Sequence, residues 1–266
     1  IEQQFPKLRV GCSSHPKGTI KLNLNKTALV TGSVKRLGRD IALKLAELNF
    51  DVVLNYFNSN DDDAKRTSDE IREKGVDVLC VKADLRKVDE IKRMFAEVEG
   101  KFGRLDVLVN NAAIFERMDF FDVTEDVFDE FMTMNLKNAF FCSQEAAKLM
   151  MKNSEKPCSI INISSLGGIQ NWQTVIPYSL AKVGVIKLTK LLAKRLAPDI
   201  LVNSIAPGTI WIDGDENLTA KNEVEDKYPM KRFGKSEDIN SMIEYLTVKN
   251  KWTTGNVFVV DGGISL

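Results

Sequence analysis

Tyr178 and Lys182 are four positions apart, a spacing that places both side chains on one face of a helix. A lysine ammonium at that distance favours the ionised phenolate, so we expect the pKa of Tyr178 to fall below its ordinary value of about 10. Ser165 lies thirteen residues before the tyrosine, just after the apolar segment 159–163. This grouping predicts that Tyr178 donates a proton near neutral pH.

A second pair with the same spacing, Tyr245 and Lys249, serves as an internal comparison. No serine at the end of an apolar segment accompanies it, and we interpret Tyr245 as an ordinary residue of a late amphipathic helix. The context of the first pair, rather than its spacing, therefore indicates catalysis.

The elements that must position these residues alternate regularly along the chain. Apolar segments typical of strands occur at 27–31, 51–56, 77–82, 105–110, 159–164, 200–205 and 256–260. Amphipathic segments typical of helices lie between them, at 38–48, 64–74, 88–102, 127–151, 178–196 and 237–247. Continuous apolar strands indicate burial on both faces, so the pattern predicts an α/β fold. We expect a single-domain, Rossmann-type, doubly wound parallel sheet of about seven strands with helices on both faces.

We assign this domain to residues 25–266. Residues 1–24 follow no hydrophobic period because Pro6, Gly11, Pro16 and Gly18 interrupt it, and the order of a signal peptide is missing. We expect these residues to form a loosely held extension.

The composition excludes several classes of function. Lysine plus arginine equals aspartate plus glutamate at 37 each, so no net charge attracts nucleic acid or an anionic membrane. The four cysteines are widely spaced and the chain has one histidine, so neither a disulfide framework nor a metal site is expected. No apolar segment reaches the roughly 18 residues that span a bilayer. These features predict a protein of the cytoplasm.

The segment 31–38 lies where the first strand turns into the first helix. Gly32 permits a tight turn, and Gly38 allows close packing between helix and strand. Backbone N–H groups and the N-terminus of a helix at such a turn suit a pyrophosphate. The loop therefore predicts a dinucleotide cofactor.

The end of the second strand favours NADP(H) over NAD(H). A carboxylate at this place normally bonds the free ribose 2′-hydroxyl, yet no acid appears before Asp61. Lys35 and Arg36 place two cations in the loop, where a 2′-phosphate could be reached.

From residue 26 to the C-terminus these motifs resemble the short-chain dehydrogenase/reductase family. The loop matches Thr-Gly-x-x-x-Gly-x-Gly, with Arg36 at the middle glycine, and 110–113 matches Asn-Asn-Ala-Gly, with Ala113 in the last place. Asp84 corresponds to the residue that contacts the adenine ring in that family. Pro-Gly at 207–208 and Val-Asp-Gly-Gly at 260–263 match the later motifs.

The loop and the resemblance together predict one set of cofactor-binding residues. These are Gly32, Ser33, Lys35, Arg36, Leu37, Gly38, Asn55, Phe57, Asn58, Ser59, Asp84, Leu85, Asn111, Ala112, Ala113, Tyr178, Lys182, Pro207, Gly208 and Ile210.

The resemblance also implies a catalytic tetrad of Asn135, Ser165, Tyr178 and Lys182. In the family the tyrosine exchanges a proton with the substrate oxygen while hydride passes between nicotinamide and carbonyl carbon. The serine bonds that oxygen, and the lysine holds the nicotinamide ribose. Asn135 would anchor a water that connects the lysine with solvent.

Loops at the carboxyl ends of the strands, at 114–122, 166–177 and 209–229, are expected to contact the substrate. Their aromatic residues suit a flat or apolar molecule. We single out Phe115, Trp172 and Trp211, and we expect the third loop to close as a lid.

Two substrate classes and one non-catalytic role stay open. Much of the chain resembles 3-oxoacyl-carrier-protein reductases, which favours an acyl-thioester carbonyl as the substrate. Pteridine reductases carry the same Lys-Arg-Leu-Gly sequence in the phosphate loop and an aromatic where Phe115 stands, but an aspartate at the position of Ser165. A cofactor-binding scaffold on the same fold is the third alternative. The resemblance also implies a homotetramer.

Overall fold

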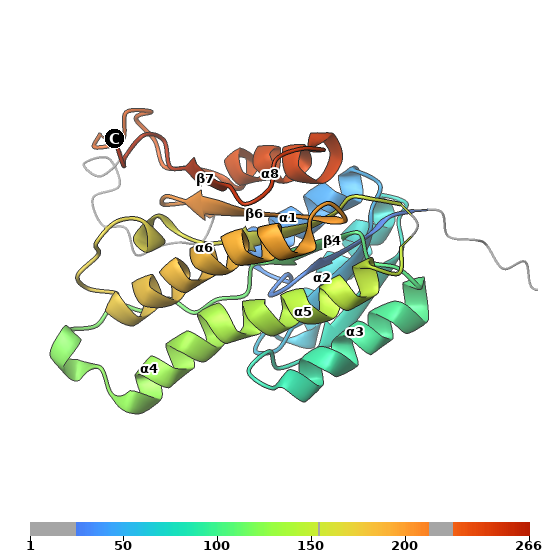
Figure 1. Cartoon of the computed structure of the whole chain (residues 1–266), viewed down its shortest axis with the longest axis horizontal. Coiled ribbons are helices and arrows are strands. Elements are labelled where there is room, and N and C mark those ends of the chain that lie inside the picture. The colour runs from blue at the N-terminus through green and yellow to red at the C-terminus, as the bar shows by residue number, and fades with distance from the viewer. Residues whose placement is uncertain (1–24, 154, 213–225) are drawn as a thin grey trace, which may run out of the picture.

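The computed structural model describes residues 25–153, 155–212 and 226–266 (Figure 1). The expected extension at 1–24 lies outside these residues, and so does most of the expected lid, at 213–225.

Seven parallel strands form one sheet in the order β3-β2-β1-β4-β5-β6-β7, which confirms the predicted doubly wound topology. Their bounds are β1 (Thr27–Val30), β2 (Asp51–Tyr56), β3 (Val78–Lys82), β4 (Val107–Asn110), β5 (Cys158–Ile163), β6 (Ile200–Pro207) and β7 (Val257–Val260). The order reverses direction at β1, where Ala28 pairs with Val52 of β2 on one side and with Val107 of β4 on the other. In such sheets the crevice at the reversal point binds ligands.

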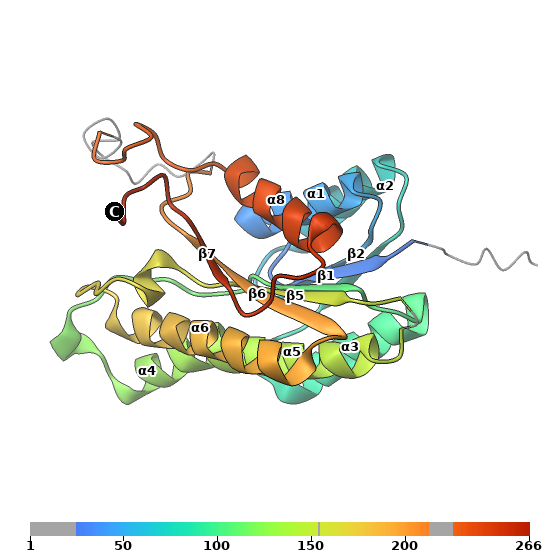
Figure 2. The same cartoon turned by 45° about the horizontal axis from the view of Figure 1, so that its top comes forward.

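Helices cover both faces of the sheet (Figure 2). One layer contains α1 (Arg36–Glu47), α2 (Asp61–Glu73) and α8 (Ser236–Glu244). The other contains α3 (Val88–Phe102), α4 (Glu125–Met132), α5 (Asn138–Met150) and α6 (Ile176–Leu196). No helix within the described residues is both long enough and apolar enough to cross a membrane.

The apolar strands supply two cores because successive side chains point to opposite faces of the sheet. Ala28 and Val30 join the core under α1, α2 and α8, whereas Leu29 between them joins the core under α3 and α5. The continuous apolar sequence of β1 thus follows from its burial on both sides.

The helix predicted at 127–151 is interrupted. A π-helical segment, η2 (Thr133–Lys137), separates α4 from α5. The same occurs after α8, where η4 (Tyr245–Lys249) is π-helical. Hydrophobic periodicity does not detect one inserted residue, so the sequence predicted continuous helices.

Candidate active site and cofactor cavity

The turn after β1 has the geometry that its glycines were expected to provide. Gly32 has a φ of +60°, in the left-handed region, and a Cβ on Gly38 would lie 2.2 Å from the carbonyl oxygen of Gly32. Arg36 also has a positive φ, of 53°, at the position where the family motif has glycine. The backbone at Arg36 thus keeps the left-handed conformation that favours glycine, although this residue carries an arginine side chain.

Asn111 and Thr31 fasten this loop to the end of β4. The Asn111 amide nitrogen donates to the carbonyl oxygens of Thr31 (2.9 Å) and Gly32 (3.1 Å). The hydroxyl of Thr31 accepts from the backbone N–H groups of Asn111 and Ala112. These bonds hold the segment 31–38, the predicted phosphate loop, in place at the reversal point of the sheet.

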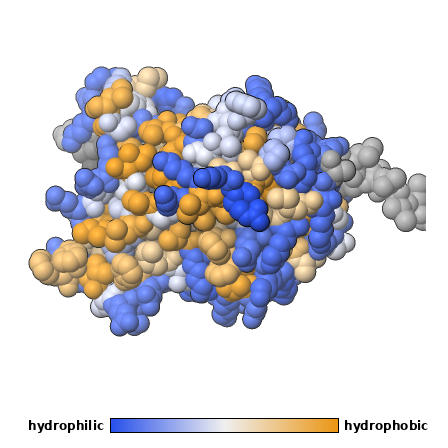
Figure 3. All heavy atoms as spheres, in the orientation of Figure 1, coloured by the Kyte–Doolittle hydropathy of each residue, from blue (hydrophilic) through white to orange (hydrophobic). Residues whose placement is uncertain are grey.

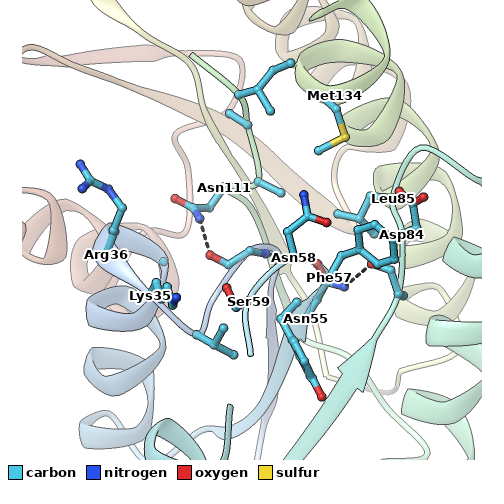
Figure 4. A pocket seen from close by; sticks show the side chains of 18 of the residues that line it. Lys35, Arg36, Asn55, Phe57, Asn58, Ser59, Asp84, Leu85, Asn111 and Met134 are labelled. Atoms are coloured by element: carbon cyan, nitrogen blue, oxygen red, sulfur yellow. Dashed lines mark hydrogen bonds between the residues drawn. The ribbon is translucent and has the colours of Figure 1, made fainter. Parts of the chain in front are cut away.

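A cavity of about 440 Å³ opens there (Figure 4). The side chains around it come from the phosphate loop, the end of β2, the segment after β3 and the segment after β4. Fourteen of the predicted cofactor-binding residues line it: Gly32, Lys35, Arg36, Leu37, Gly38, Asn55, Phe57, Asn58, Ser59, Asp84, Leu85, Asn111, Ala112 and Ala113.

The other six lie outside this lining. Ser33 is fully buried, and its hydroxyl accepts from the backbone N–H of Asn55. Pro207, Gly208 and Ile210 belong to the end of β6 and the segment after it, where Ile210 bridges to Gly234. Tyr178 and Lys182 lie on α6.

Sequence reasoning missed several residues at this cavity, among them Arg86, Glu130 and Met134. Arg86 donates from Nε to Asp84 Oδ1 (2.8 Å) and from Nη2 to Oδ2 (3.0 Å), and its guanidinium lies 5.2 Å from the centre of the Phe57 ring. Asp84, expected to contact adenine directly, is therefore already engaged by an arginine. The signal in the sequence was a cation two residues after the motif aspartate.

Asp63 was missed as well. Its carboxylate lies 2.7 Å from Lys35 Nζ and 2.8 Å from Arg66 Nη2. Asp63 and both cations line a second, more polar cavity of about 760 Å³ that also includes Arg36 and Trp211. Lys35 and Arg36 line both cavities, so the two adjoin at the phosphate loop.

The four predicted catalytic residues are all buried. Ser165 follows β5 and accepts a hydrogen bond from the backbone N–H of Gly167 (3.0 Å). Tyr178 and Lys182 lie in the first two turns of α6, as the four-residue spacing predicted. The side chain of Ser165 is near enough to Tyr178 to influence the pKa of the phenol.

The pKa of Tyr178 corrects one expectation. Burial raises this pKa above its ordinary value, and the Ser165 side chain acts in the opposite direction without overcoming it. Lys182 does not lower it in this structure. The lysine Nζ lies 5.5 Å from the centre of the tyrosine ring and donates to the carbonyl oxygen of Ile163 (2.9 Å). Burial lowers the pKa of Lys182 itself to about 8.

Asn135 lies in the π-helical segment η2. Its side chain accepts from the backbone N–H of Ile114 (3.1 Å) and donates to the carbonyl oxygen of Phe131 (3.1 Å). The asparagine thus joins η2 to the segment that follows β4. Its expected link to Lys182 through a water stays a prediction.

Two of the three predicted substrate residues lie beside the tyrosine. The Phe115 ring meets the Tyr178 ring edge to face, with centroids 5.0 Å apart. Trp172 packs on the cluster of Phe131, Val175 and Tyr178. Trp211 lies elsewhere, because its ring stacks on Phe233 and lines the second cavity.

The comparison pair has a structural role. Tyr245 is partly exposed, and its ring packs against Phe258. Lys249 forms an ion pair with Glu244 (3.1 Å). Within the part of the chain that the structure describes, no cluster of three or more histidine, cysteine, aspartate or glutamate residues could hold a metal ion.

The residues of the first cavity fit a dinucleotide. The space that a Cβ on Gly38 would need is occupied by the loop itself, so the glycine lets α1 begin directly against the loop, as in dinucleotide-binding turns. Asn55 donates to the carbonyl of Ala83 and accepts from Gly32 N–H, which fixes the floor of the cavity between β2 and the segment after β3.

Comparison with known proteins agrees with this geometry. The family model described as Enoyl-(Acyl carrier protein) reductase matches residues 32–265. A 3-oxoacyl-[acyl-carrier-protein] reductase of Staphylococcus epidermidis is 38% identical over 245 residues, which are 91% of this chain and 99% of that protein. The oxidoreductase YohF of Escherichia coli is 34% identical over 91% of this chain and 96% of its own length.

A solved structure of acetoin dehydrogenase from Enterobacter cloacae superposes with a TM-score of 0.84 at 32% identity, covering 91% of this chain and 96% of that one. A short-chain alcohol dehydrogenase from Sinorhizobium meliloti gives a TM-score of 0.84 at 30% identity, covering 92% and 98%. The chain therefore belongs to the short-chain dehydrogenase/reductase family. It is an oxidoreductase, similar over most of its length to 3-oxoacyl-[acyl-carrier-protein] reductases.

Proposed function

We propose that this protein reduces a carbonyl group to an alcohol with NADPH, and that the substrate is of the 3-oxoacyl type. The observation that carries the proposal is the placement of Tyr178 and Lys182 together on α6, with the lysine Nζ 5.5 Å from the centre of the tyrosine ring. Ile114, which lines the first cavity, packs on the cluster that contains Tyr178. The family assignment and the reductases among its relatives support it.

Two side chains of the tetrad, those of Tyr178 and Ser165, would act on the same oxygen atom of the substrate. The nicotinamide, when bound, would supply the hydride. Tyr178 would donate its phenolic proton to the carbonyl oxygen of the substrate, and Ser165 would donate a hydrogen bond to the same oxygen as its negative charge grows. The raised pKa of Tyr178 keeps the phenol protonated at neutral pH, which is the form that a proton donor requires.

Lys182 would assist Tyr178 from its place over the tyrosine ring. Its ammonium now donates to the carbonyl of Ile163. A ribose hydroxyl at this place would offer the lysine a further acceptor, and the positive charge would favour the phenolate that forms when Tyr178 gives up its proton. Tyr178 would thus transfer the proton, and Lys182 would stabilise the phenolate that remains.

The apolar surroundings of Tyr178 support an acyl substrate. Phe131 and Val175 are buried against the tyrosine, and Ile114, Met118 and Trp172 pack on this cluster. A short acyl chain beside the reacting carbonyl would find apolar contacts here, whereas a charged substrate would not.

A dihydropterin is the second candidate, and one contact favours it. The Phe115 ring is 54% exposed and lies edge to face with Tyr178, at the side from which a flat ring could stack on it. Ser165 argues against this candidate, because it replaces the aspartate that the resemblance to pteridine reductases leads one to expect.

One experiment separates these functions. Oxidation of NADPH by the purified protein should be followed with an acetoacetyl thioester and, separately, with dihydrobiopterin. We expect turnover of the thioester alone. Turnover of the pterin alone would replace the proposal with the second candidate, and cofactor binding without turnover of any carbonyl would indicate the scaffold role. Repeating the assay with NADH tests the preference for NADPH. We also propose that the protein acts in the cytoplasm.

A further inference from the structure

The carboxylate of Asp63 forms an ion pair with Lys35, one of the two cations predicted to bind the 2′-phosphate of NADP(H). Asp63 lies in the first turn of α2, after the cap residue Asn60, and its side chain is 11% exposed. Lys35 reaches it from the phosphate loop across 2.7 Å, and Arg66 reaches it from the same helix across 2.8 Å. The hydrogen bond from Lys35 holds the pKa of Asp63 below its usual range, so the carboxylate is charged at neutral pH.

The neighbouring acids are engaged elsewhere. Asp61 accepts from Lys82 (3.2 Å) and from the hydroxyl of Tyr56 (3.1 Å). Asp40, which also lines the second cavity, pairs with Arg39 and with the hydroxyl of Ser236. Asp63 is therefore the carboxylate whose described ion pairs include a cation of the phosphate loop.

We propose that Asp63 sets the discrimination between NADPH and NADH by competing with the 2′-phosphate for Lys35. The inference rests on the proposed function, because it concerns the cofactor of the same site. A phosphate on the adenosine ribose carries nearly two negative charges and must share the lysine with the carboxylate, whereas an unphosphorylated ribose meets no such competition. Asp63 thus keeps the preference for NADPH smaller than Lys35 and Arg36 alone would make it.

Asp63→Asn removes the charge and keeps the shape of the side chain. We expect it to tighten binding of NADPH about tenfold, which is the effect of one unit charge removed at close range near a protein surface. Binding of NADH should change less than about twofold, because that cofactor has no 2′-phosphate to compete with Asp63 for Lys35. The gain in NADPH affinity should shrink as salt is added, since salt screens the charges of Asp63, Lys35 and the 2′-phosphate.

The measurement is isothermal titration of the full chain with NADPH and with NADH, at low and at high salt. Asp62→Asn is the matched control, because Asp62 is the exposed preceding residue and loses the same charge. A double variant, Asp63→Asn with Lys35→Gln, tests whether Asp63 affects NADPH affinity through Lys35. If the carboxylate acts through Lys35, the gain in the Lys35→Gln background falls to less than half.

Asp63→Ser, which also suits the first turn of a helix, provides a second variant if the asparagine protein folds poorly. NADPH affinity that both variants leave unchanged or weaken would overturn the inference while leaving the proposed function in place. A wild-type protein that binds neither dinucleotide would overturn the proposed function, and this inference with it.

Discussion

Lys182 is a charged group that the folded protein buries without a described carboxylate partner. Burial lowers its pKa from 10.5 to about 8, a shift that corresponds to roughly 3 kcal/mol of differential free energy. Below pH 8 both the folded and the unfolded chain hold the proton, and the folded state bears the cost of the buried charge. Between pH 8 and 10.5 the folded state loses the proton first, so Lys182 destabilises the fold less as the pH rises.

Lys182→Met should therefore make the protein more stable and inactive. We expect the free energy of unfolding at pH 7 to rise by about 1–2 kcal/mol, since an apolar side chain of similar length replaces the buried ammonium. The advantage of the variant over the wild type should shrink by about 2 kcal/mol between pH 7 and 9.5. Denaturant unfolding at both values of pH measures this difference. A variant that is less stable at pH 7, or an advantage that does not depend on pH, would show that burial of the charge is not the main cost.

Tyr178→Phe tests the proton donor. The turnover number should fall by about 10²–10⁴, the usual contribution of a positioned acid, because the phenylalanine has no proton to give. The affinity for NADPH, measured by fluorescence titration, should stay within about twofold of the wild type. Near-normal turnover by this variant would remove Tyr178 from the mechanism.

At the scale of single residues, the sequence predicted where Tyr178 and Lys182 lie better than it predicted what their side chains contact. Spacing alone placed Tyr178 and Lys182 on one face of a helix, and the structure shows them there. It did not predict that the lysine amine would lie over the ring and bond a strand carbonyl, because that contact joins α6 to β5. The pair of Lys35 and Asp63 was missed for the same reason, since 28 positions separate the two residues along the chain.

The elements around the phosphate loop depend on one close approach. A Cβ on Gly38 would lie 2.2 Å from the carbonyl oxygen of Gly32 and 2.5 Å from the amide nitrogen of Asn111. The first of these is a backbone atom, so the start of α1 would have to move away from the end of β1.

Gly38→Ala should consequently weaken cofactor binding more than tenfold and lower the free energy of unfolding by about 1–3 kcal/mol, the usual cost of overpacking. Gly100→Ala is its control, because Gly100 lies inside α3 and a Cβ there meets nothing within 4 Å. That substitution should leave cofactor affinity unchanged and stabilise α3 slightly, by about 0.5–1 kcal/mol. Titration with NADPH and thermal unfolding of both variants check the pair, and equal effects would contradict the steric argument.

The succession of strands and helices was predictable because each buried strand has to be apolar and each covering helix amphipathic. The interruption at η2 was not, since Asn135 sits among residues whose periodicity continues across it. A π-helical turn changes which side chains face the sheet and lets the asparagine reach both Ile114 and Phe131. That local choice depends on tertiary contacts rather than on the helix's own residues.

At the scale of the whole molecule, two groups of apolar side chains are exposed, one on α5 and α6 and one on and before β7. Phe140 of α5 and Leu180, Val183 and Leu191 of α6 are 43% to 56% exposed. Apolar side chains gather over these two helices in the space-filling view (Figure 3). Two further exposed apolar side chains are Val259, on the edge strand β7, and Trp252, in the segment before that strand. We propose that the first surface and the second each bury against a copy of the same chain, which gives a homotetramer.

Charge placed in either surface should halve the assembly. Val183→Asp with Leu191→Asp should give dimers held by the β7 surface, and Val259→Asp with Trp252→Ser should give dimers held by α5 and α6. Sedimentation velocity measures the masses, with Glu73→Lys on exposed α2 as the control that stays tetrameric. A monomeric wild-type protein would refute the arrangement.

The order of the sheet has a consequence for how the chain is made. β2 pairs with β1, β3 with β2, β4 with β1, and β5, β6 and β7 each with the strand before it in the chain. Each strand after β1 therefore finds a neighbour already synthesised, and none has to be inserted between two strands that have paired. The cavity-forming strands β1 to β4 are complete at Asn110, before Ser165, Tyr178 or Lys182 has been translated. The strands that border the first cavity can thus form before the predicted catalytic residues of α6 exist.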